Sequence, residues 1–250
     1  MACVAAVGDI HLGADSPGVL RPALSELSAD VLLLAGDLTR LGTVEEARVV
    51  AGELAGLHVP VVAVLGNHDY QSDQQDGVAA VLEDAGVTVL DGTGVMVEVG
   101  PRRIGVAGVK GFGGGFAGKC ATEFGEPEMK DFVRHSRRHA ERLHEALAGL
   151  AGQGADLLVA LTHYSPVKDT LTGEPPEIYP FLGSYQLAEA IDSAGADLAV
   201  HGHAHAGVET GLTPGGVRVR NVAQPVIRRA YAVYSLDSEG GDDGEQRYSE

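Results

Sequence analysis

The chain has 250 residues, with 18 Lys and Arg against 35 Asp and Glu, which gives a formal net charge of −17. Hydrophobic residues make up 44% and charged residues 21% of the chain, ordinary globular values that exclude wholesale disorder. The acidic balance argues against binding to long nucleic acid or an anionic membrane, because either partner requires basic surface. Two cysteines make no disulfide framework, no apolar run approaches a membrane span, and the N-terminus lacks a basic leader. We therefore expect a soluble, cytoplasmic α/β protein.

The first part of the chain alternates predicted strands with predicted helices. Short, uncharged runs rich in β-branched residues lie at 4–7, 31–35 and 61–65. Such runs are typical of strands buried on both faces. Ser16 and Pro17 predict the start of a helix after the first run, and Thr43 with Glu46 forms a capping box after the second. The period of about 30 residues matches successive βαβ units, which predicts a parallel sheet.

From residue 87 the pattern changes to closely spaced strands. Apolar runs at 87–90, 95–99 and 104–109 surround an Asp-Gly pair at 91–92 and predict an antiparallel meander. A glycine-rich stretch over 111–118 then precedes a long amphipathic helix, predicted over about 127–150. The apolar stripe of this helix consists of Met129, Val133, Ala140, Leu143 and Leu147.

The last third of the chain returns to buried strands and ends in an acidic tail. The predicted strands lie at 157–161, 198–200, 217–222 and 231–236. A helix is expected to begin at Ser184, between the first two of them. The tail over 237–250 is acidic and glycine-rich, a composition typical of disorder. Because the chain has no internal repeat or clear linker, we expect one domain over 1–236 that contains two sheets.

Polar residues follow five of the predicted strands at the point where each strand ends. They are Asp9, His11, Asp37, Asn67, His68, His163, His203 and His205. Ligands of open α/β sheets bind outside the carboxyl ends of the strands, so these groups are expected at one edge. Carboxylate, imidazole and amide oxygen suit Mn²⁺, Fe²⁺ or Zn²⁺. Eight such groups are too many for one ion and fit two ions that share a bridging carboxylate.

Each of these residues is a weak signal when taken alone. An Asp after a strand is more often a turn former or helix cap than a ligand, and a lone residue such as His163 more often has an ordinary core or loop role. The pair His203 and His205 is a better signal, because side chains two residues apart on an extended segment point the same way. The ordered series, beside glycines that allow close backbone approach, indicates a metal site.

The same series resembles the motifs of the calcineurin-like metallophosphoesterase family. The motifs are Asp9-x-His11, Gly36-Asp37, Gly66-Asn67-His68-Asp69, His163 and Gly202-His203-x-His205, in that order and without a substitution. The resemblance covers most of the chain. It implies a mixed α/β fold, a four-layer αββα sandwich with two mixed sheets, and a metal site at the carboxyl ends of the strands.

The resemblance also implies how the residues share two divalent metal ions. One ion would be held by Asp9, His11, Asp37 and His205. The other would be held by Asp37, Asn67, His163 and His203, so that Asp37 bridges the two ions. His68 would not be a ligand and would face the substrate instead.

The reaction expected from these groups is hydrolysis of a small phosphate ester, either a monoester or a diester. Two ions about 3.5–4 Å apart clamp a phosphoryl group and acidify a water, which provides hydroxide for in-line attack on phosphorus. His68 would stabilise the developing charge or protonate the leaving alkoxide. Asp69 is either the carboxylate that orients His68 or an ordinary turn residue.

Two other functions compete with this one. A nuclease of the same superfamily is disfavoured by the net charge, and a non-catalytic scaffold with the same fold is expected to have lost ligands or His68, none of which is missing. Several further features have both a functional and a purely structural interpretation. They are His201, Cys120, the glycine-rich stretch 111–118, the segment 164–185 and the basic face of the long helix around 134–144.

Overall fold

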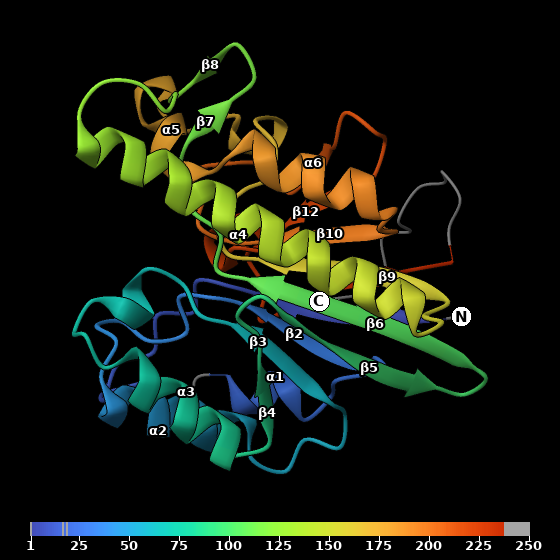
Figure 1. The fold of residues 1–250 in the computed structure, drawn as a ribbon. Helices are drawn as coiled ribbons and strands as arrows, with labels where there is room; N and C mark the ends of the chain where they lie inside the picture. The colour runs from blue at the N-terminus through green and yellow to red at the C-terminus, as the bar shows by residue number, and fades with distance from the viewer. Residues whose placement is uncertain (1, 17, 19, 238–250) are drawn as a thin grey trace.

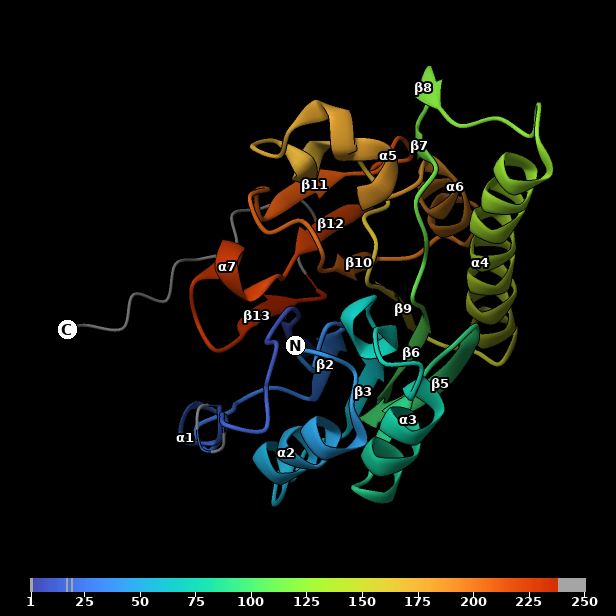
Figure 2. The same ribbon diagram turned by 90° about the vertical axis from the view of Figure 1, so that its left-hand side faces the viewer.

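The computed structural model describes residues 2–16, 18 and 20–237, which fold into four layers (Figure 1). Two large mixed β-sheets face each other in the middle. Helices α2 (Val44–Leu54) and α3 (Gln75–Asp84) lie outside the first sheet, and α4 (Pro127–Gly152) and α6 (Tyr185–Ala194) lie outside the second, as Figure 2 also shows. The predicted αββα sandwich with two mixed sheets is confirmed.

The first sheet has the strand order β13-β1-β2-β3-β4. Its strands are β1 (Cys3–Val7), β2 (Val31–Ala35), β3 (Val61–Val64), β4 (Val87–Val89) and β13 (Ala232–Ser235). The four strands β1 to β4 are parallel, and β13 pairs antiparallel with β1. Every residue of β2 and β3 is buried, because one face packs on helices and the other on the second sheet. This burial explains why these strands are apolar at every position.

The second sheet has the strand order β11-β12-β10-β9-β6-β5. Its strands are β5 (Thr93–Val99), β6 (Arg102–Val109), β9 (Leu157–Thr162), β10 (Leu198–His201), β11 (Thr210–Leu212) and β12 (Arg218–Asn221). The inner strands are parallel, and each edge strand is antiparallel to its neighbour. The edge strand β11 was not predicted, because its three residues centre on a glycine and carry no apolar pattern.

The predicted three-stranded meander is wrong, because its strands belong to different sheets. β4 pairs parallel with β3, whereas β5 pairs antiparallel with β6 in the second sheet. The Asp-Gly pair at 91–92 therefore carries the chain from one sheet to the other. The reason is helix α3, which the sequence analysis did not identify: it provides the crossover between β3 and β4, so these strands form one more βαβ unit.

Helix α1 (Arg21–Leu24) is shorter than predicted and begins later. Ser16 does not cap it, and Pro17 lies outside the described residues. The backbone N–H groups of Leu20 and Arg21 donate instead to the carboxylate of Glu53 in α2, at 2.8 and 2.6 Å. A side chain distant in sequence thus satisfies the exposed N–H groups at the start of this helix.

The other predicted helix starts are confirmed. Thr43 and Glu46 form the capping box of α2, and the Ser184 hydroxyl accepts from the backbone of α6. In α4 the apolar stripe is buried except for Met129, which is 44% exposed. The smaller elements are β7 (Gly115–Phe116), β8 (Lys119–Cys120), α5 (Tyr179–Leu182), α7 (Gln224–Ile227) and 3₁₀ turns at His68–Tyr70, Asp169–Leu171 and Pro176–Ile178.

The core lies mainly between the two sheets, where leucines of β2 pack with β6 and β9 residues such as Ile104 and Leu161. Within the described residues, no helix combines the length and apolar character needed to cross a bilayer. Of the predicted tail, only Asp237 is described, and its carboxylate accepts from the Ala2 backbone at 2.7 Å and pairs with Arg102. Residues 238–250 lie outside the described part.

Candidate active site

The predicted site residues come together at the edge where the carboxyl ends of strands from both sheets meet. Among the contacts that join the sheets at this edge are two hydrogen bonds to or from the main chain. His163, after β9, donates its Nδ1–H to the Ala35 carbonyl at the end of β2, at 2.8 Å. The carboxylate of Asp9, after β1, accepts from the backbone N–H of His203 at 2.9 Å. The site is therefore built at the junction of the two sheets.

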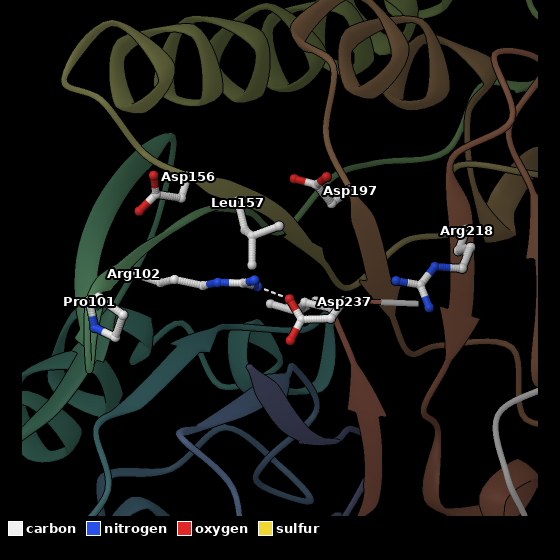
Figure 3. Close-up of a pocket in the computed structure, with 8 residues that line it drawn as sticks. Pro101, Arg102, Asp156, Leu157, Asp197, Arg218 and Asp237 are labelled. Atoms are coloured by element: carbon white, nitrogen blue, oxygen red, sulfur yellow. Dashed lines mark ion pairs between the residues drawn. The ribbon is translucent and has the colours of Figure 1, made fainter. Parts of the chain in front are cut away.

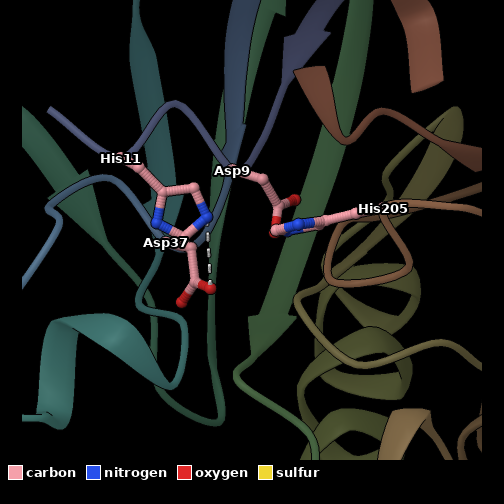
Figure 4. Close-up of side chains that lie close together, drawn as sticks. All are labelled: Asp9, His11, Asp37 and His205. Carbon is pink, nitrogen blue, oxygen red and sulfur yellow. Dashed lines mark hydrogen bonds and ion pairs between the residues drawn. The ribbon is translucent and has the colours of Figure 1, made fainter. Parts of the chain in front are cut away.

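A first group of side chains could hold one ion. It consists of Asp9, His11, Asp37 and His205, whose ligand atoms all lie within 4.8 Å of one another (Figure 4). His205 Nε2 lies 2.8 Å from Asp9 Oδ1, and His11 Nε2 lies 3.9 Å from Asp37 Oδ2. These are the four residues expected for the first ion.

A second group shares Asp37 with the first. Asp37, His163 and His203 offer ligand atoms that also lie within 4.8 Å of one another. His163 Nε2 is 3.4 Å from Asp37 Oδ1 and 2.9 Å from the amide oxygen of Asn67. Asn67 therefore lies beside this group, as expected, and Asp37 is the one carboxylate common to both groups.

Unsatisfied polar atoms show that these residues suit bound cations. His11 Nε2 and Asp37 Oδ2 are buried and lack a hydrogen-bond partner within the described part of the chain. An unsatisfied buried polar atom costs about 1–3 kcal/mol. In addition, the other ring nitrogens of His163 and His203 donate to the Ala35 and Phe181 carbonyls. This arrangement is typical of metal-binding histidines, because it fixes the tautomer and the ring orientation.

The electrostatics of the site agree with this interpretation. Burial lowers the pKa of His203 to about 3, which keeps the imidazole neutral, the form that binds metals. Burial alone would raise the pKa of Asp37, but His163 and the His68 backbone N–H outweigh it and hold that pKa well below its usual range. Burial would lower the pKa of His163, but Asp37 raises it to about 9. Asp37 and His163 thus each favour the charged form of the other.

The backbone of the site is strained. Six non-glycine residues of the described chain have a positive φ, and four of them are site residues: Asp9 (56°), His11 (43°), Asp37 (50°) and His203 (71°). Such conformations cost about 1–3 kcal/mol each and cluster at functional sites, where the surrounding structure imposes them. The positive φ values turn the backbone sharply after β1, β2 and β10, and these turns direct the four side chains to a common centre.

Glycines next to the ligand residues provide the space that this packing needs. A Cβ on Gly66 would overlap the carboxylate of Asp37, and one on Gly202 would overlap that of Asp9. Gly66 and Gly202 are therefore required because a carboxylate packs directly against each of them. Gly36 is favoured for another reason, since its φ of 81° is a conformation that other residues rarely adopt.

Comparison with known sequences agrees with this geometry. The sequence model of the calcineurin-like phosphoesterase family matches residues 4–207, which include every residue of both groups. The chain belongs to this family. It is therefore a hydrolase of phosphate esters from a family that depends on a dinuclear metal centre. No functionally curated protein matches the sequence of this phosphoesterase.

Several solved structures share the fold of this phosphoesterase. Phosphopantetheinyl hydrolase from Mycobacterium tuberculosis is 18% identical with a TM-score of 0.64, and the match covers 97% of this chain and 99% of that one. A protein of Thermus thermophilus is 17% identical with a TM-score of 0.59, covering 94% and 99%. A putative 5′-nucleotidase from Staphylococcus aureus is 14% identical with a TM-score of 0.56, covering 88% and 48%. At these identities the likeness establishes the fold.

His68 lies beside the first group of this phosphoesterase. Its ring makes an edge contact with His11, with the ring centres 4.5 Å apart, and its Nδ1 lies 2.9 Å from the Arg40 carbonyl. Because a carbonyl oxygen only accepts, Nδ1 carries the hydrogen, and Nε2 remains available for a substrate. The backbone N–H of His68 donates to Asp37 Oδ1 at 2.8 Å.

Of the two roles considered for Asp69, the contacts of its carboxylate favour the structural one over orienting the His68 ring. Its buried carboxylate accepts from the backbone N–H groups of Gly66 and Thr39, at 2.8 and 2.9 Å, and from the Thr39 hydroxyl at 2.6 Å. It thus ties the loop after β3 to the loop after β2. The His68 ring is oriented by the Arg40 carbonyl, and Asp69 acts on it only through the loop backbone.

The remaining features divide between structural roles and the borders of the site. His201 is buried, and its ring hydrogen-bonds the Thr170 hydroxyl at 2.8 Å, as a supporting residue would. On α4, Arg134 and Arg137 both pair with Glu123, so the basic face is largely neutralised. The backbone N–H groups of the glycine-rich stretch at 114 and 115 donate to main-chain carbonyls and cannot cradle a phosphate.

The segment 164–185 borders the site, as one interpretation of the sequence predicted. The Tyr164 ring packs against His203, with the ring centres 4.3 Å apart, and the Phe181 carbonyl lies 3.2 Å from His203 Nε2. The sequence analysis missed Lys110, which directly follows β6 at the same sheet edge. The signal that found the other residues, a polar residue at the end of a buried strand, would also have found this one.

Another hollow lies at the opposite end of the second sheet (Figure 3). It is lined by Pro101, Arg102, Asp156, Leu157, Asp197, Arg218, Leu236 and Asp237. Two of its carboxylates have structural roles as hydrogen-bond acceptors. Asp156 accepts from the backbone N–H of Arg103 at 2.8 Å, and Asp197 accepts from the backbone N–H of Leu158 at 2.7 Å. These contacts close the amino ends of strands, so this hollow is not the reaction site.

Proposed function

We propose that this phosphoesterase hydrolyses small phosphate esters, monoesters or diesters, in the cytoplasm, using two divalent cations bound side by side. The observation that supports this proposal most directly is the position of Asp37, which belongs to both groups of potential ligands and has one buried carboxylate oxygen with no hydrogen-bond partner among the described residues. A carboxylate with one oxygen toward each group is suited to bridge two ions.

The first ion would be held by Asp9, His11, Asp37 and His205, and the second by Asp37, Asn67, His163 and His203. Mixed carboxylate, imidazole and amide ligands favour Mn²⁺, Fe²⁺ or Zn²⁺ over Mg²⁺ or Ca²⁺, which prefer oxygen ligands throughout. When bound, such a pair would polarise the phosphoryl group and lower the pKa of a water, so that hydroxide is available as the nucleophile near neutral pH.

The role we assign to the chain itself rests on His68. Its Nδ1–H is engaged by the Arg40 carbonyl, so Nε2 is the atom that would hold or deliver a proton. In the imidazolium form Nε2–H donates a hydrogen bond to a phosphoryl oxygen, or gives its proton to the leaving alkoxide. The backbone N–H of the same residue holds Asp37, which fixes the ring relative to the ligand groups.

A small substrate is favoured over a nucleic acid. The net charge of −17 opposes a polyanion, and the segment that carries Tyr164 and Phe181 borders the second group of ligands. A nuclease of the same superfamily is therefore the weaker candidate.

The proposal is tested by metal analysis of the purified protein joined to a panel of phosphomonoesters and phosphodiesters. We expect two metal equivalents per chain and turnover of at least one ester class, both lost in Asp37→Ala. Two bound metals without turnover of any ester would favour a non-catalytic scaffold. Tight, salt-sensitive retention on duplex DNA would favour a nuclease.

A further inference from the structure

Lys110 is a buried lysine at the edge of the site. It follows the last residue of β6, and its backbone carbonyl accepts from the N–H groups of His163 and Tyr164, both at 3.0 Å. These bonds hold it beside the ends of the strands that carry the ligand groups. The residue is only 9% exposed, yet its ammonium makes no hydrogen bond or ion pair with any described residue.

The surroundings of the ammonium are aromatic. Lys110 Nζ lies 4.7 Å from the ring centre of Tyr70, 5.3 Å from that of Phe112 and 5.5 Å from that of Tyr164. All three rings come from segments that follow strands at the active-site edge. We call Tyr70, Phe112 and Tyr164 the aromatic cage of Lys110. Tyr164 also contacts the His203 ring, so the aromatic cage adjoins the second group of ligands.

The cage only partly compensates the lysine for its burial. A cation over an aromatic ring gains about 0.5–2 kcal/mol, whereas the three N–H donors of the ammonium have no acceptor among the described residues. Burial lowers the pKa of Lys110, and the opposing effects of Asp91 and Asp37 do not reverse this. The protein alone therefore leaves this charge poorly satisfied.

We propose that Lys110, held by Tyr70, Phe112 and Tyr164, binds an anionic oxygen of the phosphate ester. The oxygen belongs either to the phosphoryl group that is transferred or to a second acidic group on the leaving alcohol. This inference rests on the proposed function for the position of the substrate, and it adds a cationic subsite made entirely by protein.

The test compares Lys110→Met with wild type. Methionine keeps the apolar contacts with the rings and removes the charge, while Lys110→Arg retains the charge. Lys119→Met, at an exposed lysine in β8 away from the ligand groups, is the control for a change in net charge. The substrates are phenyl phosphate and 4-carboxyphenyl phosphate, which differ by one acidic group. Inorganic phosphate is the binding probe, measured by calorimetry.

We expect Lys110→Met to keep its metals and melting temperature and to lose about 10–100-fold in kcat/KM, the value of a hydrogen bond to a charged group. An equal loss on both substrates, with weaker phosphate binding, assigns Lys110 to the phosphoryl oxygen. A loss confined to 4-carboxyphenyl phosphate assigns it to the second acidic group. Lys110→Arg should recover part of either loss. Values of kcat/KM for both substrates, and of phosphate affinity, that lie within twofold of those of Lys119→Met overturn the proposal.

A second measurement on the wild-type protein covers the case in which Lys110→Met does not fold. The probe is 4-phosphonobenzoate, which carries both acidic groups and cannot be hydrolysed. It should slow acetylation of Lys110 but leave the acetylation rate of Lys119 unchanged when both are followed by mass spectrometry. Equal acetylation rates at Lys110 with and without the probe refute the subsite. A protein that shows this protection yet hydrolyses no ester would contradict the proposed function and leave the subsite standing.

Discussion

Replacing His68 with asparagine tests whether its imidazole takes part in the reaction. The backbone N–H that donates to Asp37 is unchanged by the substitution, so both groups of ligands should stay in place. The substitution removes the imidazole, and with it the hydrogen bond to the Arg40 carbonyl, worth about 0.5–1.5 kcal/mol, and the edge contact with His11. Because His68 is only half-buried, we expect the fold and the metal content to be retained.

The turnover rate should respond much more strongly than stability. A positioned acid or hydrogen-bond donor contributes about 10²–10⁴-fold to a rate, so kcat of His68→Asn should fall by that factor. If protonation of the leaving group dominates, p-nitrophenyl esters should lose less than alkyl esters, because p-nitrophenolate needs little protonation. A similar loss on both would indicate charge stabilisation at the phosphoryl oxygens instead.

The matched control is His58→Asn, on an exposed loop, which should leave kcat unchanged. Elemental analysis and thermal melting of both variants separate an effect on chemistry from an effect on folding. Full activity of His68→Asn with every ester would remove the ring from the mechanism and refute the reasoning. A variant that has lost its metals would show that the residue acts on the ligands.

Four further outcomes are expected. Asp37→Ala should lose both metals, whereas Asn67→Ala should weaken only the second; two full equivalents in Asp37→Ala by elemental analysis would contradict the bridge. Gly66→Ala should lose metal because its Cβ overlaps the Asp37 carboxylate, while Gly149→Ala in helix α4, with open space around it, should keep full metal content. Chelation should lower the melting temperature, because ions that bind only the folded chain stabilise it; an unchanged Tm after metal loss would argue against buried ligands. Finally, duplex DNA should bind weakly at physiological salt in a filter assay.

The parallel strands and the ligand residues could be predicted from sequence because each depends on local pattern. Strands such as β2 are buried on both faces and read as continuous apolar runs, and the polar residues that follow them necessarily share one sheet edge. The assignment of β4 failed because it depends on pairing: nothing within 87–90 distinguishes a strand beside β3 from one beside β5.

Other features of the site depend on contacts between distant segments and were therefore out of reach. The carboxylate of Asp69 is turned away from its sequence neighbour by three donors on Gly66 and Thr39. The positive φ at Asp9 and Asp37 is imposed by the surrounding packing, since an aspartate does not by itself require this conformation. The position of Lys110 after a strand can be recognised in the sequence, but its aromatic surroundings cannot, because the three rings come from segments after β3, β6 and β9.

Because the candidate metal site lies where the two sheets meet, its residues come from widely separated parts of the sequence. Asp9, Asp37 and Asn67 come from the first third of the chain, whereas His163, His203 and His205 come from its last 90 or so residues by their place in the sequence. A ribosome must therefore have passed residue 203 before the proposed ligands of the second ion are all present, and residue 205 before those of the first are. Ions held by these residues would connect the loops after β1, β2 and β3 to the loops after β9 and β10, so we expect metal binding to be coupled to the packing of the two sheets.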